Sequence, residues 1–251
     1  MNFNLEKEFL TTLEILNKEE SVFSSDLIKS VIDLTLLDES ASIDSLKLLQ
    51  EKANINQVAA ICVLPNHLTI FNHLNNIKRA TVVNFPTGQE SQAANLTLIQ
   101  ELSSTNLAQE IDYVFPYQIY LDGQHKAALR QYQDIYLCCQ TYDLKIKVII
   151  ETGAFPNADS IYKVSSEILE IGCDFLKTST GKIAIGATPL AAFSILKAIV
   201  DTKRQAGLKV SGGIKDPRQA YLYMSLASFL NKRKITPSWF RIGASSLLSK
   251  L

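Results

Sequence analysis

The chain has 251 residues, 47% of them hydrophobic, and its 25 Lys and Arg side chains balance 25 Asp and Glu side chains. This length fits one large barrel or sheet domain, or two small domains, and the apolar content excludes a disordered chain. The zero net charge favours neither nucleic acid nor an anionic membrane surface as a partner. No apolar stretch approaches the roughly 18 residues of a membrane helix, and the polar N-terminus lacks a signal-peptide pattern, so we expect a cytoplasmic protein outside the membrane.

In chain order, helices alternate with short apolar strands. An amphipathic helix within the first 25 residues precedes a strand at 31–35, a helix at 42–53, and strands at 58–63 and 80–84. A helix at 91–102 then leads to strands at 111–114 and 147–151, followed by a helix at 158–171 and a strand at 173–177. A helix at 189–206 and strands at 208–211 and 240–243 complete the pattern.

Eight strands alternating with helices predict a (β/α)8 TIM barrel with an extra N-terminal helix. No Pro/Gly/Ser-rich linker divides the chain, so residues 1–251 are expected to form a single barrel domain. An open doubly wound sheet is the competing fold. It would usually carry a Gly-rich fingerprint after its first strand, and this sequence has none.

Charged residues lie inside or at the ends of these apolar strands. They are Asp33, Asp112, Lys147, Lys177 and Lys209. A buried ammonium is costly unless it is paired or loses its proton, and a lysine with a lowered pKa can attack a carbonyl to form a Schiff base. We therefore expect a lysine nucleophile in the barrel with a carboxylate as proton relay, although spacing alone does not choose between Lys177 and Lys209.

Two Gly/Ser-rich loops follow the last two predicted strands, at Ser211-Gly212-Gly213 and at Gly243-Ala244-Ser245-Ser246. Loops at these places commonly bind phosphate in a TIM barrel, because glycine lets the backbone approach an anion closely. Lys182 and Lys215 would add positive charge. The simpler alternative is that these glycines only make turns.

Metal and cysteine chemistry are not indicated. The three histidines, His67, His73 and His125, and the four cysteines, Cys62, Cys138, Cys139 and Cys173, show no common metal-site spacing. We expect His67 and His73 to be surface or structural residues and the thiols to be buried, although Cys62 ends a strand and could line the pocket. No metal and no cofactor are predicted.

The sequence resembles the deoxyribose-phosphate aldolases along nearly its whole length. The stretches that carry the resemblance are Ile32-Asp33-Leu34-Thr35-Leu36-Leu37, Ile61-Cys62-Val63-Leu64-Pro65, 80–88, 110–117, Lys147-Val148-Ile149-Ile150-Glu151-Thr152-Gly153, Asp174-Phe175-Leu176-Lys177-Thr178-Ser179-Thr180-Gly181-Lys182, Ala187-Thr188-Pro189, 209–214 and 241–248. The most specific of them is Phe-x-Lys-Thr-Ser-Thr-Gly.

This resemblance implies a class I aldolase that reversibly cleaves 2-deoxy-D-ribose 5-phosphate to D-glyceraldehyde 3-phosphate and acetaldehyde. It assigns Lys177 as the Schiff-base lysine, Lys209 as the neighbour that lowers its pKa, and Asp112 as the acid/base partner. The residues expected around the phosphate are Thr180, Lys182, Gly212, Gly213, Lys215, Gly243, Ser245 and Ser246. Other expected pocket residues are Asp33, Thr35, Cys62 and Lys147.

Two departures from the family pattern are visible. Lys215 occupies a position where arginine is common, which would remove a bidentate phosphate contact. The sequence ends at Leu251 without the tyrosine-ended tail of longer relatives, so we expect slower proton exchange on the enamine unless Tyr117 or another side chain substitutes.

The sequence also leaves alternative functions open. The barrel could be another Schiff-base sugar-phosphate aldolase or a transaldolase, or a catalytically silent sensor of sugar phosphates. The only partner expected besides a small-molecule sugar phosphate is a second copy of the chain in a homodimer.

Overall fold

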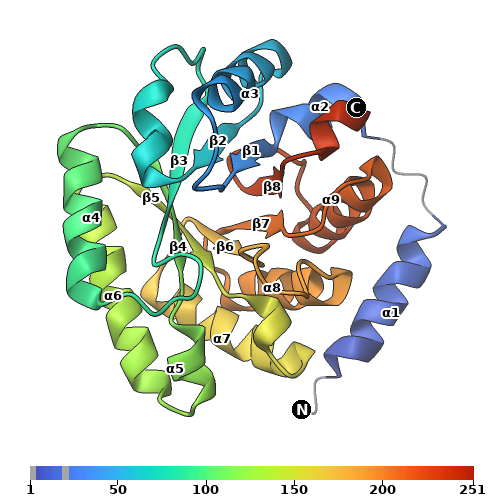
Figure 1. Cartoon of the computed structure of the whole chain (residues 1–251). Coiled ribbons are helices and arrows are strands. Elements are labelled where there is room, and N and C mark those ends of the chain that lie inside the picture. The colour runs from blue at the N-terminus through green and yellow to red at the C-terminus, as the bar shows by residue number, and fades with distance from the viewer. Residues whose placement is uncertain (1–3, 19–22) are drawn as a thin grey trace.

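The computed structural model describes residues 4–18 and 23–251 and is a closed barrel of eight parallel strands in chain order (Figure 1). The strands are β1 (Ile32–Leu36), β2 (Ala60–Val63), β3 (Lys78–Val83), β4 (Glu110–Val114), β5 (Lys145–Ile149), β6 (Phe175–Lys177), β7 (Gly207–Ser211) and β8 (Phe240–Ala244). This arrangement confirms the predicted TIM barrel. All eight predicted strands overlap observed ones.

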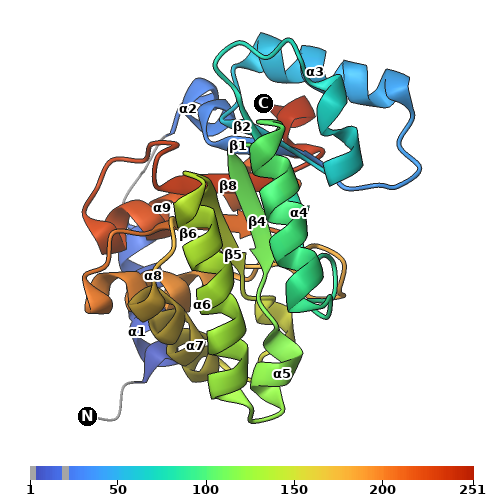
Figure 2. The ribbon, with the colours of Figure 1, turned by 90° about the vertical axis from the view of Figure 1, so that its left-hand side faces the viewer.

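Helices surround the strands, as the views along and across the barrel show (Figures 1 and 2). They are α1 (Leu5–Leu16), α2 (Ser25–Ser30), α3 (Ile43–Asn56), α4 (Gln92–Ser104), α5 (Tyr117–Leu121), α6 (His125–Thr141), α7 (Ala158–Ile171), α8 (Pro189–Thr202) and α9 (Pro217–Asn231). Three 3-10 helices are η1 (Pro65–Ile70), η2 (Thr152–Ala154) and η3 (Leu247–Lys250). None of the helices within the described ranges is long and apolar enough to cross a membrane.

The expected extra N-terminal helix is α1, which packs outside the barrel through an edge-to-face contact of Phe9 with Phe193 of α8. The prediction did not separate α2 from it, and residues 1–3 and 19–22 of the predicted segment lie outside the described residues. Helix α8 ends four residues before the predicted boundary. Lys203 adopts a left-handed conformation there, with φ of 56°, and its N–H caps the helix.

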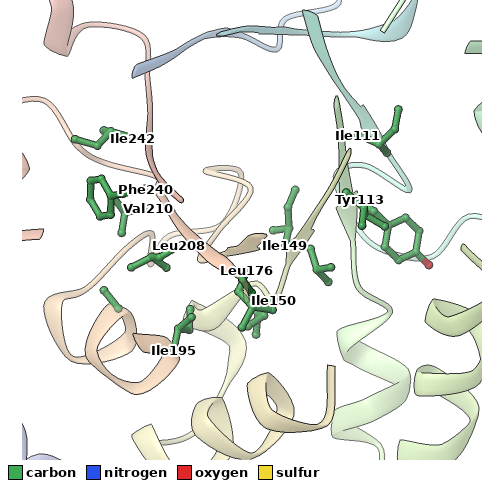
Figure 3. Close-up of a cluster of buried hydrophobic side chains, with 14 of the residues drawn as sticks. Ile111, Tyr113, Ile149, Ile150, Leu176, Ile195, Leu208, Val210, Phe240 and Ile242 are labelled. Carbon is green, nitrogen blue, oxygen red and sulfur yellow. The ribbon is translucent and has the colours of Figure 1, made fainter. Parts of the chain in front are cut away.

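The strands place charge inside the barrel and apolar side chains outside it. On β4, Ile111 and Tyr113 alternate with Glu110 and Asp112, and alternate residues of a strand point to opposite faces. Tyr113 stacks on Tyr132 of α6, with 6.2 Å between ring centroids. Figure 3 shows the apolar cluster that these outward residues form with their counterparts on β6, β7 and β8. The charged residues of β4 therefore face the barrel interior.

The interior itself is divided between apolar and charged halves. A small apolar cluster from β2 and β3 consists of Ala60, Cys62, Ala80 and Val82, whereas β1 and β4–β8 contribute the buried charges. The strand predicted at 147–151 ends earlier than expected, so Glu151 is not part of it. Strand β5 ends at Ile149, Glu151 adopts a left-handed backbone with φ of 60°, and its carboxylate turns to the loop after β6.

Candidate active site

Three lysine side chains meet one carboxylate in the charged half of the barrel. Both Lys177 Nζ and Lys209 Nζ donate to Asp112 Oδ2, at 2.7 and 2.6 Å, and Lys147 Nζ donates to Asp112 Oδ1 at 2.9 Å. All four residues are buried. The register explains the meeting, because β4, β5, β6 and β7 are consecutive in the barrel and Lys177 is directly paired with Lys209.

These lysines differ in how well they are compensated. Burial lowers the pKa of Lys177, and the neighbouring Lys209 ammonium lowers it further, although Asp112 opposes both effects. Burial also disfavours the charge of Lys209, but Asp112 and Asp33 outweigh it and raise the pKa of Lys209. The pKa of Lys147 is raised by three carboxylates in the same way. Lys177 is therefore the lysine of this cluster best able to be a neutral amine.

The thiol of Cys62 also contacts this cluster, with Sγ 3.7 Å from Asp112 Oδ2. Burial and the Asp112 carboxylate raise the pKa of Cys62 to about 11. The thiol is therefore protonated at neutral pH and poorly suited to act as a nucleophile.

A cavity of about 500 Å³ opens above Lys177, at the carboxyl ends of β1, β6, β7 and β8. The predicted site residues that line it are Thr35, Lys177, Thr180, Lys182, Gly212, Gly213, Lys215, Gly243 and Ser245. Asp33, Cys62, Asp112, Lys147 and Lys209 are buried and do not line it. Ser246 lines a neighbouring groove beside α3, and its phosphate role stays a prediction.

The backbone of the β7 loop is shaped for close approach. Gly212 and Gly213 have φ of 91° and 85°, a region that side-chain-bearing residues rarely adopt. A Cβ on Gly212 would lie 3.0 Å from Gly186 Cα, whereas a Cβ on Gly213 would meet no atom within 4 Å. Lys182 lies in the loop after the neighbouring strand β6, and its Nζ donates to the carbonyl of Leu37, after β1, at 2.9 Å. A phosphate in the cavity would therefore lie near the backbone of Gly212 and Gly213 and the side chain of Lys182.

Glu151 holds the loop that follows Lys177. Its carboxylate accepts from the Thr180 N–H at 3.2 Å and from the Thr180 hydroxyl, and that hydroxyl accepts from the Lys182 N–H at 3.0 Å. Burial raises the pKa of Glu151. Glu151 is a site residue that the sequence did not predict, because it was expected to end the strand at 147–151.

Two further lumen residues were missed, Glu110 and Arg241. Arg241 donates to Asp33 Oδ1 at 2.6 Å and to Glu110 Oε1 at 3.1 Å. The sequence did contain a signal for both residues. Arg241 is a charged residue within the predicted apolar strand at 240–243, and Glu110 directly precedes the predicted strand at 111–114.

Two other expectations concern His67 and Tyr117. His67 is buried in η1, so it is structural and not on the surface, and Tyr117 is buried on α5 and does not line the cavity. No group of three or more His, Cys, Asp and Glu side chains suited to a metal occurs in residues 4–18 and 23–251.

Gly243 gives a test of how closely Lys209 is packed. A Cβ there would lie 2.9 Å from Ser211 Cβ and 3.2 Å from Lys209 Cε. We expect Gly243→Ala to displace Lys209 and to reduce kcat by roughly 10- to 100-fold, the effect of misplacing a site group by about 1 Å. Gly123→Ala is the control for backbone strain away from the site, since Gly123 has a φ of 84° and a Cβ there meets nothing within 4 Å. Equal kcat in both variants would contradict the prediction.

Comparison with known proteins agrees with this geometry. A family model described as DeoC/LacD family aldolase matches residues 29–228. A deoxyribose-phosphate aldolase of Agrobacterium fabrum is 35% identical over 244 residues, which cover 94% of this chain and 92% of that protein.

Solved structures of similar proteins share the fold. An aldolase named QR15 has a TM-score of 0.76 at 25% identity and covers 89% of this chain and 93% of its own. A candidate deoxyribose-phosphate aldolase from Coccidioides immitis has a TM-score of 0.81 at 21% identity, with coverages of 99% and 97%. The deoxyribose phosphate aldolase of Aeropyrum pernix, described as a tetramer, has a TM-score of 0.73 at 22% identity, with coverages of 96% and 93%.

Proposed function

Because the chain belongs to the DeoC/LacD family of aldolases, we propose that it reversibly cleaves 2-deoxy-D-ribose 5-phosphate to D-glyceraldehyde 3-phosphate and acetaldehyde through a Schiff base on Lys177. The observation that carries this proposal is the combination of a lowered pKa at Lys177 with its position at the floor of the cavity. A buried amine with a lowered pKa that faces a sugar-sized cavity is suited to attack a carbonyl.

The first half of the reaction forms the imine. The neutral Lys177 amine attacks the C1 aldehyde of the open-chain sugar and gives a carbinolamine, which loses water to form a protonated imine. Asp112 Oδ2 lies 2.7 Å from Lys177 Nζ, within reach to take up and return protons directly or through one water. Lys147, on Oδ1, and Lys209, on the same oxygen as Lys177, hold the pKa of Asp112 well below its usual range and keep it ionised between these transfers.

The second half breaks the C2–C3 bond. The C3 hydroxyl loses its proton, the C2–C3 electron pair moves into the protonated imine, and D-glyceraldehyde 3-phosphate leaves. The enamine of acetaldehyde that remains takes a proton at its terminal carbon, and water hydrolyses the resulting imine to release acetaldehyde and free Lys177.

The phosphate is proposed to bind at the loops after β6, β7 and β8, with Lys182 as its main charge. We expect Lys182→Met to lower the preference for deoxyribose 5-phosphate over deoxyribose, measured as the ratio of kcat/KM values, by roughly 10- to 100-fold, because a hydrogen bond to a charged group is lost. Lys163→Met on the exposed face of α7 is the matched control. An equal loss with both sugars would argue against phosphate binding at Lys182.

Product analysis separates this proposal from the alternatives. Only deoxyribose-phosphate cleavage yields acetaldehyde, whereas a transaldolase or a ketose-phosphate aldolase would yield other carbonyl products. A sensor would bind the sugar phosphate without incorporating hydride from borohydride at Lys177. We expect the purified protein to release acetaldehyde from deoxyribose 5-phosphate. If it releases no acetaldehyde but cleaves a ketose phosphate, the proposal is overturned.

The mechanism needs no Lewis acid, because the protonated imine itself accepts the electron pair. We therefore expect dialysis against a chelator to leave kcat and KM unchanged in a coupled acetaldehyde assay. A loss of activity that added Zn²⁺ or Mg²⁺ restores would contradict the proposed chemistry.

We also propose that the enzyme works in the cytoplasm as a homodimer. Barrels of this kind commonly associate through outer helices. Light scattering of the purified chain tests the dimer against a monomer or a tetramer, which is the assembly described for the Aeropyrum pernix protein.

A further inference from the structure

Six buried charges form a closed ring inside the barrel in which cations and carboxylates alternate. We call them the charge ring. In order around the ring they are Asp112, Lys147, Glu110, Arg241, Asp33 and Lys209. The six N–O contacts range from 2.6 to 3.1 Å. Each member therefore touches at least two charges of opposite sign, a longer contact of 3.6 Å between Lys147 Nζ and Asp33 Oδ2 crosses the ring, and the ring as a whole is neutral when all six are ionised.

The ring is held by charge as much as by hydrogen bonding. The Lys147–Glu110 and Lys209–Asp33 contacts, both 2.6 Å, are ion pairs in which Glu110 Oε2 and Asp33 Oδ2 accept no hydrogen bond from the described residues. Buried ion pairs stay ionised only when every charge is compensated. A ring meets this condition better than an open chain, because no member lies at an end.

Lys177 is attached to this ring and is not part of it. Within residues 4–18 and 23–251 its single ion pair is with Asp112 Oδ2, which also accepts from Lys209, while Asp112 Oδ1 accepts from Lys147. A proton on Lys177 would therefore add a fourth cation to three carboxylates in a buried site. Loss of that proton makes the cluster neutral.

We propose that Glu110 and Arg241 are positioning residues that close the charge ring and thereby leave Lys177 as the one cation of this buried cluster without a carboxylate of its own. This inference rests on the proposed function of Lys177. Neither Glu110 nor Arg241 lines the cavity, so both act through the ring and not on the substrate. Arg241 is fixed further by its Nε–H bond to the Pro237 carbonyl and by its position over the Phe175 ring.

Other titratable groups face Lys177 as well. Cys62 on β2 is protonated at neutral pH, and Glu151 lies after β5 with its carboxylate bonded to Thr180. Neither contacts the members Glu110 or Arg241 through a hydrogen bond or ion pair among those in the described residues. Changes at the far side of the ring should therefore reach Lys177 through Asp112 and Lys209.

Opposite charge changes give opposite expected results. Arg241→Gln leaves the ring with one negative charge in excess, so a proton on Lys177 becomes more favourable. Glu110→Gln leaves one positive charge in excess, so that proton becomes less favourable. The double variant restores the balance. We measure the pH at which Lys177 is half as reactive as at its maximum. This midpoint should rise by about 0.5–1 pH unit in Arg241→Gln, fall by about as much in Glu110→Gln, and return to the wild-type value in the double variant.

The measurement uses the full chain with acetaldehyde and cyanoborohydride over a pH series. The amine forms an imine with loss of water, hydride reduces the imine, and the ethyl group on the Lys177 peptide is quantified by mass spectrometry. Arg204→Gln and Glu170→Gln are matched controls, since they remove the same charges from an exposed ion pair. Both should keep the wild-type midpoint, because surface pairs are screened by water.

Each outcome decides the inference. Shifts in the same direction for both single variants, or no shift, would assign Glu110 and Arg241 a structural role alone and overturn the proposal. If Glu110→Gln does not fold, an upward shift in Arg241→Gln that the double variant cancels still supports it, and any other result rejects it. If wild-type Lys177 is not ethylated at all, the proposed function fails, and the positioning role fails with it.

Discussion

Replacing Lys177 with methionine is expected to reduce kcat for deoxyribose 5-phosphate by roughly 10⁴-fold or more, since Lys177 is the lysine that both lines the cavity and contacts the Asp112 carboxylate. Lys209 is the nearest amine, but Asp112 and Asp33 raise its pKa and hold it as an ammonium. Reduction with borohydride in the presence of substrate should inactivate the wild type and label the Lys177 peptide. The variant should remain unlabelled.

The thermal stability of Lys177→Met should not fall with its activity. The Lys177 ammonium is a buried charge without a carboxylate of its own, so an apolar side chain of similar length is expected to leave Tm unchanged or to raise it. A folded, inactive variant would thus exclude unfolding as the reason for the loss. Lys163→Met, on the exposed face of α7, serves as control for both measurements. Labelling on the Lys209 peptide in place of Lys177 would reverse the two assignments.

Much of the barrel is readable from the sequence because its strands are short, apolar and separated by helical patterns. The lengths of α8 and of the N-terminal helix were less predictable. Lys203 ends α8 in a left-handed conformation that glycine usually adopts, and lysine gives no local signal for it. Glu151 was misplaced for a related reason, since a run of apolar residues does not show where the backbone turns out of a strand.

Some residues of the site can likewise be recognised from the sequence, whereas the roles of others depend on contacts across the barrel. Lys177 and Lys209 are both conspicuous as buried cations, and their spacing cannot rank them, because the difference lies in contacts across the barrel. Asp33 pairs with Lys209 from β1, far away in sequence, and gives that lysine the second carboxylate that Lys177 lacks. Glu110 and Arg241 become meaningful only when β4 and β8 face each other across the lumen.

Replacing Asp112 with asparagine should separate two roles that one carboxylate performs. Loss of its charge removes the anion that favours the Lys177 ammonium, so the pKa of Lys177 should fall and the acid limb of kcat/KM should move to lower pH. Loss of the proton acceptor should at the same time reduce kcat at its optimum by about 10²–10⁴-fold. The pH profile of kcat/KM and deuterium exchange into acetaldehyde measure the two effects.

The same substitution leaves three lysines without their shared carboxylate. Breaking a buried ion pair costs about 3–5 kcal/mol, which for a chain of this size lowers Tm by roughly 6–20 °C. Asp33→Asn is the matched comparison, because Asp33 is equally buried and pairs with Lys209 and Arg241 but does not contact Lys177. Its Tm should fall similarly, whereas deuterium exchange should persist. If exchange is lost equally in both variants, the proton relay does not belong to Asp112 but to the charged cluster as a whole.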